Sequence, residues 1–341
     1  MFSALDGETG RRVALKFFHP EKRGDPYRLE CFEREAAILA RLKGQRRVTS
    51  LVAPRSSVDE QLPTTVRLPF YLWFEYFALE LAATDMQAVI EEGKWDAERR
   101  LVAFRGMCRA VARVHELDVA HRDLKPGNFL VMRRGSIKLS DFGAARRFDI
   151  DAQALRPAYG VPVGDVHYTA PEMLASLHDA DPTIAFAADI YSLGAILFEL
   201  FSGQVLGLHL FSDPGYLQCL IYISQVRADE RIRIYDQLLP AVTNRTLPSV
   251  SDFARLAPDA VLERVDALYR SMAALDYHQD TRLRHFGRIF QQIDACLLVL
   301  RNHQKYMRWE QDRARREAWR QAKVQRQSRQ FAAATTQGGS T

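Results

Sequence analysis

One octet constrains the fold of this chain more than any other feature. Residues 121–128 read His-Arg-Asp-Leu-Lys-Pro-Gly-Asn, which places Asp123, Lys125 and Asn128 close together. The simplest alternative is a surface turn that contains His-Arg-Asp by chance, but an octet of this kind is improbable by chance. With 341 residues, 47% of them hydrophobic, the chain can bury a large core around such a site.

The octet resembles the catalytic loop of eukaryotic-type protein kinases, H-R-D-x-x-x-x-N, and matches every fixed position. The resemblance implies that Asp123 orients the attacking hydroxyl and accepts its proton, and that Asn128 holds a metal ion. Lys125, two positions after Asp123, is typical of the serine/threonine branch, where this lysine contacts the transferred phosphate. The resemblance includes the bacterial, eukaryotic-like members of the family.

A second segment, Asp141-Phe142-Gly143, begins eighteen residues after Asp123 (141 − 123). Between them two short apolar segments, Phe129–Met132 and Ile137–Leu139, flank a turn. A hairpin there would bring the two aspartates together. The resemblance then makes Asp141 a ligand of the Mg²⁺ that bridges the β- and γ-phosphates of ATP.

A third segment, Val13-Ala14-Leu15-Lys16, resembles the V-A-I-K strand, whose lysine neutralises the α- and β-phosphates. Its ion-pair partner should come from the helix that follows. Glu35 is the best candidate and Glu33 is the alternative, because Glu35 shares a helix face with Leu39, where packing against Phe142 is expected.

Further segments extend the resemblance over roughly residues 1–290, and they imply scaffold roles. Glu172 of Ala-Pro-Glu is expected to pair with a late arginine, Arg282, and Asp189 to brace the catalytic-loop backbone. The adenine-reading hinge is expected at Glu80–Ala82 and would use backbone groups. The nucleotide-binding residues implied by the resemblance are Lys16, Glu80, Ala82, Asn128, Leu130 and Asp141.

The order of elements, strands first and helices later, predicts an α+β fold with a small β-rich lobe on a larger helical lobe. We expect strands at 11–18, 70–76 and 77–82, and helices at 27–42, 86–92 and 96–117. The predicted division is a small lobe at 1–82, a large lobe at 83–302, a polar, basic helix at 303–330 and a disordered tail at 331–341.

The match departs from the family pattern in two places. In the family, the residue just after the glycine-rich loop lies fifteen positions before the lysine, which is Met1 here (16 − 15), so this loop and the first strand are missing from the match. A start assigned too late, a truncated gene or a genuine pseudokinase would each explain that. In addition, Asp165 replaces the hydroxyl residue of G-T-x-x-Y-x-A-P-E, where it would accept from Lys125 but repel Asp123.

The activation segment lacks the usual phosphorylation sites. Residues 144–164 contain no serine or threonine, and their only hydroxyl belongs to Tyr159. Arg122 would ordinarily hold an activation-loop phosphate. We therefore hypothesise that an aspartate (149, 151 or 165) substitutes, and that serine/threonine phosphorylation here does not activate the protein.

The predicted function is an ATP- and Mg²⁺-dependent serine/threonine protein kinase acting on protein substrates. The rival from another class is a pseudokinase or nucleotide-binding scaffold, which would retain the fold with little phosphotransfer. The missing glycine-rich loop and Asp165 support this rival, and the intact catalytic residues oppose it.

The composition indicates which binding partners and which cellular compartment to expect. The formal charge of +5 is mild and sits mostly in the tail, so nucleic acid is not expected. Four scattered cysteines indicate a reducing, cytoplasmic location. Acidic residues interrupt the apolar stretch 66–90, so no transmembrane segment is expected. The tail, with Tyr306, Trp309 and Trp319 among arginines, would bind an acidic partner or a membrane surface, or form a solvated helix whose aromatics pack back on the lobe.

Overall fold

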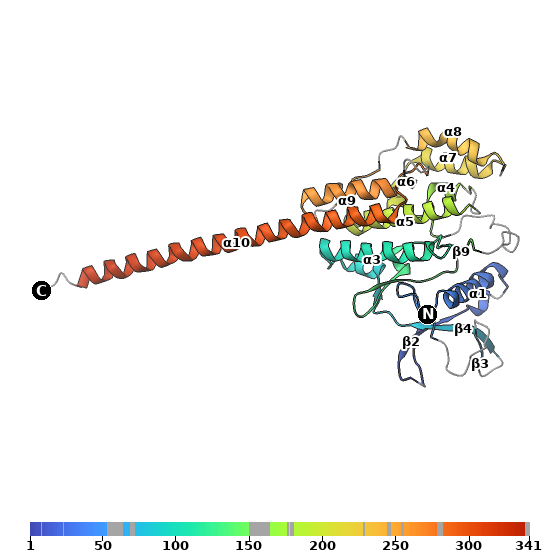
Figure 1. The fold of residues 1–341 in the computed structure, drawn as a ribbon, viewed down its shortest axis with the longest axis horizontal. Helices are drawn as coiled ribbons and strands as arrows, with labels where there is room; N and C mark the ends of the chain where they lie inside the picture. Colours follow the sequence, from blue (N-terminus) through green and yellow to red (C-terminus); the bar gives the residue numbers. More distant parts are fainter. Residues whose placement is uncertain are drawn as a thin grey trace.

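The computed structural model has a small sheet-containing lobe and a larger helical lobe (Figure 1), which confirms the predicted fold class. It describes residues 1–7, 9–22, 24–52, 64–68, 72–149, 164–175, 177, 181–227, 229–243, 247–253, 256–277 and 282–337. The strands are β1 Phe2–Leu5, β2 Arg12–Phe17, β3 Thr64–Leu68, β4 Leu72–Glu80, β5 Thr84–Asp85, β6 Val119–Ala120, β7 Phe129–Val131, β8 Ile137–Leu139 and β9 Arg146–Arg147. The helices are α1 Pro26–Arg41, α2 Met86–Glu92, α3 Ala97–His115, α4 Pro171–Leu174, α5 Pro182–Ser202, α6 Leu206–Phe211, α7 Pro214–Gln225, α8 Arg231–Thr243, α9 Asp259–Met272 and α10 Phe286–Gln337.

The small lobe is an antiparallel sheet in the order β1-β2-β4-β3, with α1 packed against it. The register places Lys16 of β2 opposite Phe77 of β4. Phe32 of α1 packs on Phe77 with ring centroids 4.9 Å apart and on Phe18 at 5.5 Å. This aromatic contact fixes α1 over the sheet and so places the helix residue Glu35 near Lys16.

Local sequence signals explain where α1 begins. The Asp25 side chain accepts hydrogen bonds from the backbone N–H groups of Tyr27 and Arg28, and Pro26 occupies the first helical turn. An aspartate N-cap satisfies two N–H groups that lack helical partners, and proline there loses no hydrogen bond. The predicted helix at 27–42 is therefore confirmed within one residue at each end.

The helical lobe is built around α5, which is buried along nearly its whole length and contacts α3 and α9. Asp181 caps its first turn, and Gly203, at φ +71°, ends it in the left-handed conformation that glycine adopts without strain. Among the described helices only α5 is long and apolar enough to cross a membrane. Because 94% of its most apolar window is buried inside the lobe, we interpret it as a core helix.

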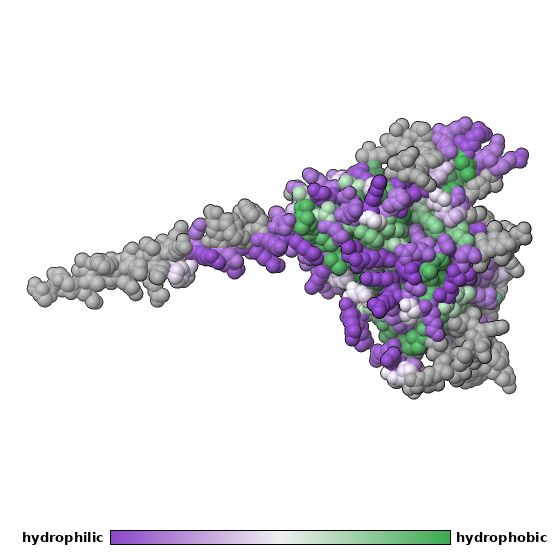
Figure 2. Space-filling view, viewed as in Figure 1, coloured by the Kyte–Doolittle hydropathy of each residue, from purple (hydrophilic) through white to green (hydrophobic). Residues whose placement is uncertain are grey.

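The last helix, α10, begins against α3 and α9 and then projects far beyond the lobes (Figure 1). Its buried side chains end at Leu300, and the described surface of the projecting part is hydrophilic (Figure 2). The helix continues to Gln337, so 331–337 are helical where the sequence predicted disorder. Trp319 is 64% exposed, which contradicts the expectation that it packs back on the lobe.

Two strand predictions were wrong. The sequence predicted separate strands at 70–76 and 77–82, but 72–80 form a single strand, β4, which pairs on one side with β2 and on the other with β3 at 64–68. β3 pairs with residues 72–76 and β2 with residues 76–80, so the two registers together carry the strand through the apparent break near Phe77, whose side chain is buried. The predicted strand at 11–18, the helices at 86–92 and 96–117 and the hairpin at 129–139 are confirmed within two residues.

Candidate active site

The backbone of the catalytic loop is anchored by Asp189 of α5, which is 1% exposed. Its two carboxylate oxygens accept hydrogen bonds from the backbone N–H groups of His121 (2.8 Å) and Arg122 (2.9 Å), and His115 Nε2 lies 2.8 Å away. Burial would raise the pKa of Asp189, but the His115 hydrogen bond and the neighbouring charges lower it. Asp189 therefore braces the loop as an ionised group, as predicted.

Around Asp123 the loop gathers three of the predicted groups. Asn128 Nδ2 donates to the Asp123 carbonyl at 2.7 Å and to its Oδ2 at 3.3 Å. Lys125 Nζ lies between two carboxylates, 3.5 Å from Asp123 Oδ2 and 3.8 Å from Asp165 Oδ2. The expected contact from Lys125 to Asp165 is therefore present. Repulsion of Asp123 is countered because the backbone N–H of Asp165 donates to Asp123 Oδ1 at 2.8 Å.

The backbone at the site is held in conformations that most residues avoid. Arg122 (φ +67°) and Asp141 (φ +62°) are left-handed without being glycine. Gly164 (φ +95°) packs so closely that a Cβ there would lie 2.5 Å from the Arg122 carbonyl oxygen and 3.2 Å from Asp123 Oδ1. Only glycine allows residues 164 and 165 to approach the catalytic carboxylate this closely.

A three-membered charge network crosses from the small lobe to the large lobe. Lys16 Nζ lies 2.5 Å from Glu35 Oε2 and 3.0 Å from Asp141 Oδ1, which selects Glu35 over Glu33 as the partner. Burial raises the pKa of Glu35 to about 7 against the opposing charge of Lys16. For Lys16 and Asp141 burial opposes the charged form, but the ion pairs prevail: the pKa of Lys16 is raised and that of Asp141 is lowered.

The donor chemistry of Asn128 and Asp141 suits a hard divalent cation. Asp141 contributes a carboxylate that is partly exposed, and the Asn128 amide nitrogen already donates to Asp123, which leaves its oxygen as the acceptor. Carboxylate and amide oxygens are the ligands that Mg²⁺ takes in proteins. These two residues therefore fit the metal that the resemblance implies.

The predicted hinge follows β4, where the Glu80 carboxylate is already engaged. It accepts from Lys138 Nζ at 2.5 Å and from the backbone N–H of Ser50 at 2.8 Å. Its side chain thus braces the end of β4, so the predicted adenine contact would have to use backbone groups. Leu130 of β7 is paired with Asp85 of β5, and Asp85 follows the half-buried Ala82 by three positions. The roles of these residues as nucleotide ligands stay predictions.

Two buried polar pairs hold the end of the activation segment to the large lobe. Arg282 and Glu172 form an ion pair whose side chains are both 0% exposed, as predicted. Tyr168 donates to Glu199 of α5 at 2.7 Å. Burial raises the pKa of Glu199 to about 7, against the lowering effect of that hydrogen bond.

Sequence reasoning missed three positioning residues. Arg34 Nη1 donates to the Gly143 carbonyl at 3.0 Å and so ties α1 to Asp-Phe-Gly, whereas His115 and Lys138 hold Asp189 and Glu80. Each partner lies more than fifty positions away in the sequence, so no local pattern could have indicated these contacts.

The hypothesis that an aspartate replaces a loop phosphate gains no support from Asp149, which pairs with Arg147 at 3.0 Å and also with Arg41. Asp165 contacts Lys125 and lies 3.1 Å from His167 Nδ1. Asp151 and Tyr159 lie outside the described residues. The hypothesis therefore stays a prediction.

A two-lobed fold with these two aspartates, the lysine–glutamate pair and the asparagine defines a phosphoryl-transfer catalytic domain. A family model described as "Protein kinase domain" matches residues 1–235, and the chain belongs to this family. It is 31% identical over 206 residues to "Serine/threonine-protein kinase PknA" of Mycobacterium tuberculosis, covering 60% of this chain and 44% of that protein.

Other relatives span bacteria and fungi. The chain is 29% identical over 201 residues to "Probable serine/threonine-protein kinase PknB" of Bifidobacterium longum, covering 59% of this chain and 28% of that protein. It is 30% identical over 254 residues to "Mitogen-activated protein kinase spm1" of Cytospora mali, covering 70% and 54%. The chain thus spans less than half the length of the two bacterial relatives.

Proposed function

We propose that this chain is a serine/threonine protein kinase that transfers the γ-phosphoryl group of ATP to a hydroxyl of a protein substrate. The observation that carries the proposal is the linked set Lys16, Glu35 and Asp141 beside Asp123 and Asn128, in the arrangement that phosphoryl transfer requires.

In the proposed reaction the substrate hydroxyl oxygen bonds to the γ-phosphorus while the bond to the β–γ bridging oxygen breaks, which releases ADP. Asp123 orients the hydroxyl and accepts its proton, and Lys125 stabilises the negative charge on the transferred group. Lys16, held by Glu35, contacts the α- and β-phosphates. Mg²⁺ held by Asn128 and Asp141 would neutralise phosphate charge when bound.

The proposal extends to compartment and partners. All four cysteines are free, with Cys108 and Cys296 buried, which supports a reducing, cytoplasmic location. The basic helix at 303–330 projects from the lobes, where it is available to an acidic partner.

The first prediction concerns Asp123→Asn, compared with the parent in an assay with labelled ATP, Mg²⁺ and a generic protein substrate. We expect transfer by the parent and a loss of roughly 10²–10⁴-fold in the variant, because asparagine cannot accept the hydroxyl proton. Equal transfer by both proteins would contradict the role of Asp123. Silence from both, with ATP still raising the unfolding temperature, would favour a nucleotide-binding scaffold.

A further inference from the structure

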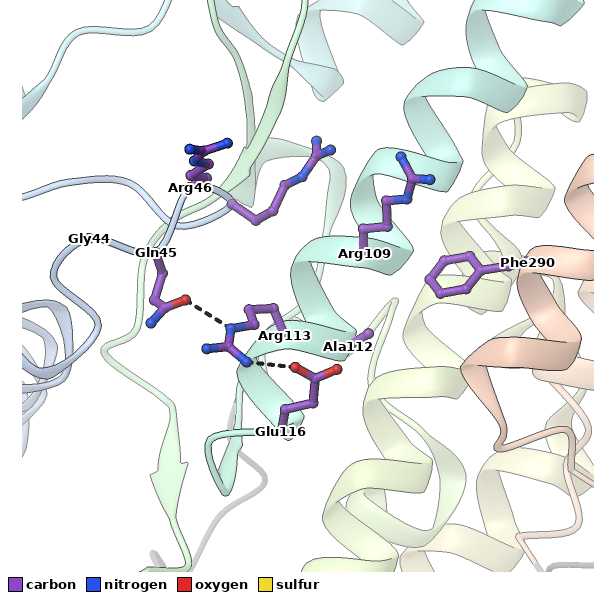
Figure 3. A pocket seen from close by; sticks show the side chains of 9 residues that line it. Gly44, Gln45, Arg46, Arg109, Ala112, Arg113, Glu116 and Phe290 are labelled. Atoms are coloured by element: carbon purple, nitrogen blue, oxygen red, sulfur yellow. Dashed lines mark hydrogen bonds and ion pairs between the residues drawn. The ribbon is translucent and has the colours of Figure 1, made fainter.

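A second concave site lies outside the nucleotide-binding residues. A cavity of about 440 Å³ opens between the loop that follows α1, the exposed face of α3 and the start of α10. Figure 3 shows Phe290 of α10 projecting toward the α3 side chains Arg109 and Ala112. The site is lined by Gly44, Gln45, Arg46, Arg47, Arg109, Ala112, Arg113, Glu116 and Phe290. None of these residues belongs to the proposed catalytic or nucleotide-binding set.

The lining is strongly basic. It has four arginines and one glutamate, a net formal charge of +3 (4 − 1). Arg113 is already oriented, since its Nε donates to Gln45 Oε1 at 2.8 Å and its Nη1 donates to Glu116 Oε2 at 2.7 Å (Figure 3). The nearby Asp294 is also engaged, because it pairs with Arg105 at 2.9 Å.

The other three guanidinium groups have no carboxylate paired with them among the described residues. Within the described part of the chain, the side chains of Arg46, Arg47 and Arg109 form no ion pair. Slight desolvation and the like charges of Arg105 and Arg47 lower the pKa of Arg109, although its side chain is exposed and Asp294 acts in the opposite direction. Like charges held together around a cavity are unfavourable until an anion joins them.

We propose that this cavity binds the phosphate monoester of a phosphorylated serine or threonine side chain on a protein partner. A phosphomonoester carries close to two negative charges and three acceptor oxygens, so several guanidinium groups can bind it together. A carboxylate would leave most of the basic lining uncompensated. Phe290 and Ala112 add apolar surface beside the arginines. A peptide that carries the phosphate would cover this surface, whereas a free phosphate ion would leave it exposed.

The location gives the bound phosphate a defined structural effect. The loop after α1 already contacts the large lobe, because the carbonyl of Arg47 accepts from the backbone N–H of Leu139 in β8 at 2.8 Å, whereas Arg109 belongs to α3. A phosphate bound by both arginines would add a further link between this loop and the large lobe. Because this loop directly follows the helix that carries Glu35, the site is suited to receive a regulatory partner.

The test measures binding of a fluorescein-labelled alanine/glycine peptide with one central phosphothreonine to the full chain, by fluorescence polarisation at fixed salt. The variants are Arg47→Gln with Arg109→Gln, the matched control Arg288→Gln, and Glu116→Gln. Arg288 is an exposed arginine of α10 that does not line the cavity. Circular dichroism checks that each variant is folded.

We expect the phosphopeptide to bind at least tenfold more tightly than its unphosphorylated counterpart. The double variant should lose at least tenfold in affinity, Arg288→Gln should be unchanged, and Glu116→Gln should bind severalfold more tightly because the one lining carboxylate is removed. Failure of the phosphopeptide to bind, or equal losses in the double variant and Arg288→Gln, would overturn the site. If inorganic phosphate displaced the phosphopeptide at a concentration equal to that of the peptide, the site would bind the free ion, and the proposal of a protein partner would be overturned.

Discussion

At the residue scale, the ion pair with Lys16 distinguishes Glu35 from Glu33, which is only two positions away in the sequence. Glu35 is 2% exposed and lies 2.5 Å from Lys16, whereas Glu33 is exposed on the same helix. The helical period turns one glutamate toward the cleft and the other toward solvent. Only the first can pair with Lys16.

We therefore predict that Glu35→Gln lowers kcat/KM by roughly 10²-fold, because the buried charge that orients Lys16 is lost. Glu33→Gln is the matched control and should retain parental activity. Steady-state kinetics with ATP as the varied substrate measures both. Equal effects of the two substitutions would contradict the assignment of Glu35.

The raised pKa of Glu35 leads to a prediction of how activity depends on pH. Burial raises the pKa of Glu35 to about 7, so the carboxylate gains a proton as pH falls through neutrality and its ion pair with Lys16 weakens. We expect kcat/KM of the parent to fall as pH is lowered from 8 to 6. The ratio of parent to Glu35→Gln activity should shrink over the same range. A ratio independent of pH would contradict this titration.

The residues of the site were largely predictable because the spacing of short segments specified them. Asn128 contacts Asp123, and Lys16 contacts both Glu35 and Asp141, whereas the catalytic and binding roles of these residues stay predictions. The effect of Asp165 was only half predictable. Its side chain suggested repulsion of Asp123, whereas its backbone N–H donates to that carboxylate, an interaction that any residue at this position could supply.

At the element scale, α4 and the segment before α10 are joined by the pair of Glu172 and Arg282, both fully buried. We predict that Glu172→Gln destabilises the fold by about 3–5 kcal/mol, because it leaves the guanidinium buried without its counter-charge. Glu98→Gln, which breaks the exposed Arg301 pair, should cost under about 1 kcal/mol. Urea unfolding of both variants tests the contrast, and comparable costs would contradict it.

The elements also show where sequence reasoning fails. Helices capped by aspartates, such as α1, were predictable because the signals are local. Strand β4 was divided wrongly because its length depends on pairing with β2 and β3, which are distant in the sequence. Such non-local pairing overrides local propensity.

Considered as a whole molecule, the catalytic domain should be independent of the projecting part of α10. Ile293, Cys296, Leu297 and Leu300 are the last buried side chains of this helix among those described, and the following described side chains are mostly exposed. The last of them, Leu300, lies two residues before the boundary predicted at 302, which stays a prediction, and the helix itself continues to Gln337. The sequence predicted a helix at 303–330 but not that it continues the core helix, because a polar segment gives no periodic apolar signal.

We predict that a chain ending at Asn302 unfolds with a free energy within about 1 kcal/mol of the full chain, since only solvated helix is removed. A chain ending at Gln291 should lose the cooperative transition, because removing several buried apolar side chains costs roughly 2–5 kcal/mol for each large one. Thermal unfolding followed by circular dichroism distinguishes the two truncations. If the chain ending at Asn302 were destabilised as strongly as the shorter one, the projecting helix would have to pack on the lobes in solution, and the boundary at 302 would be wrong.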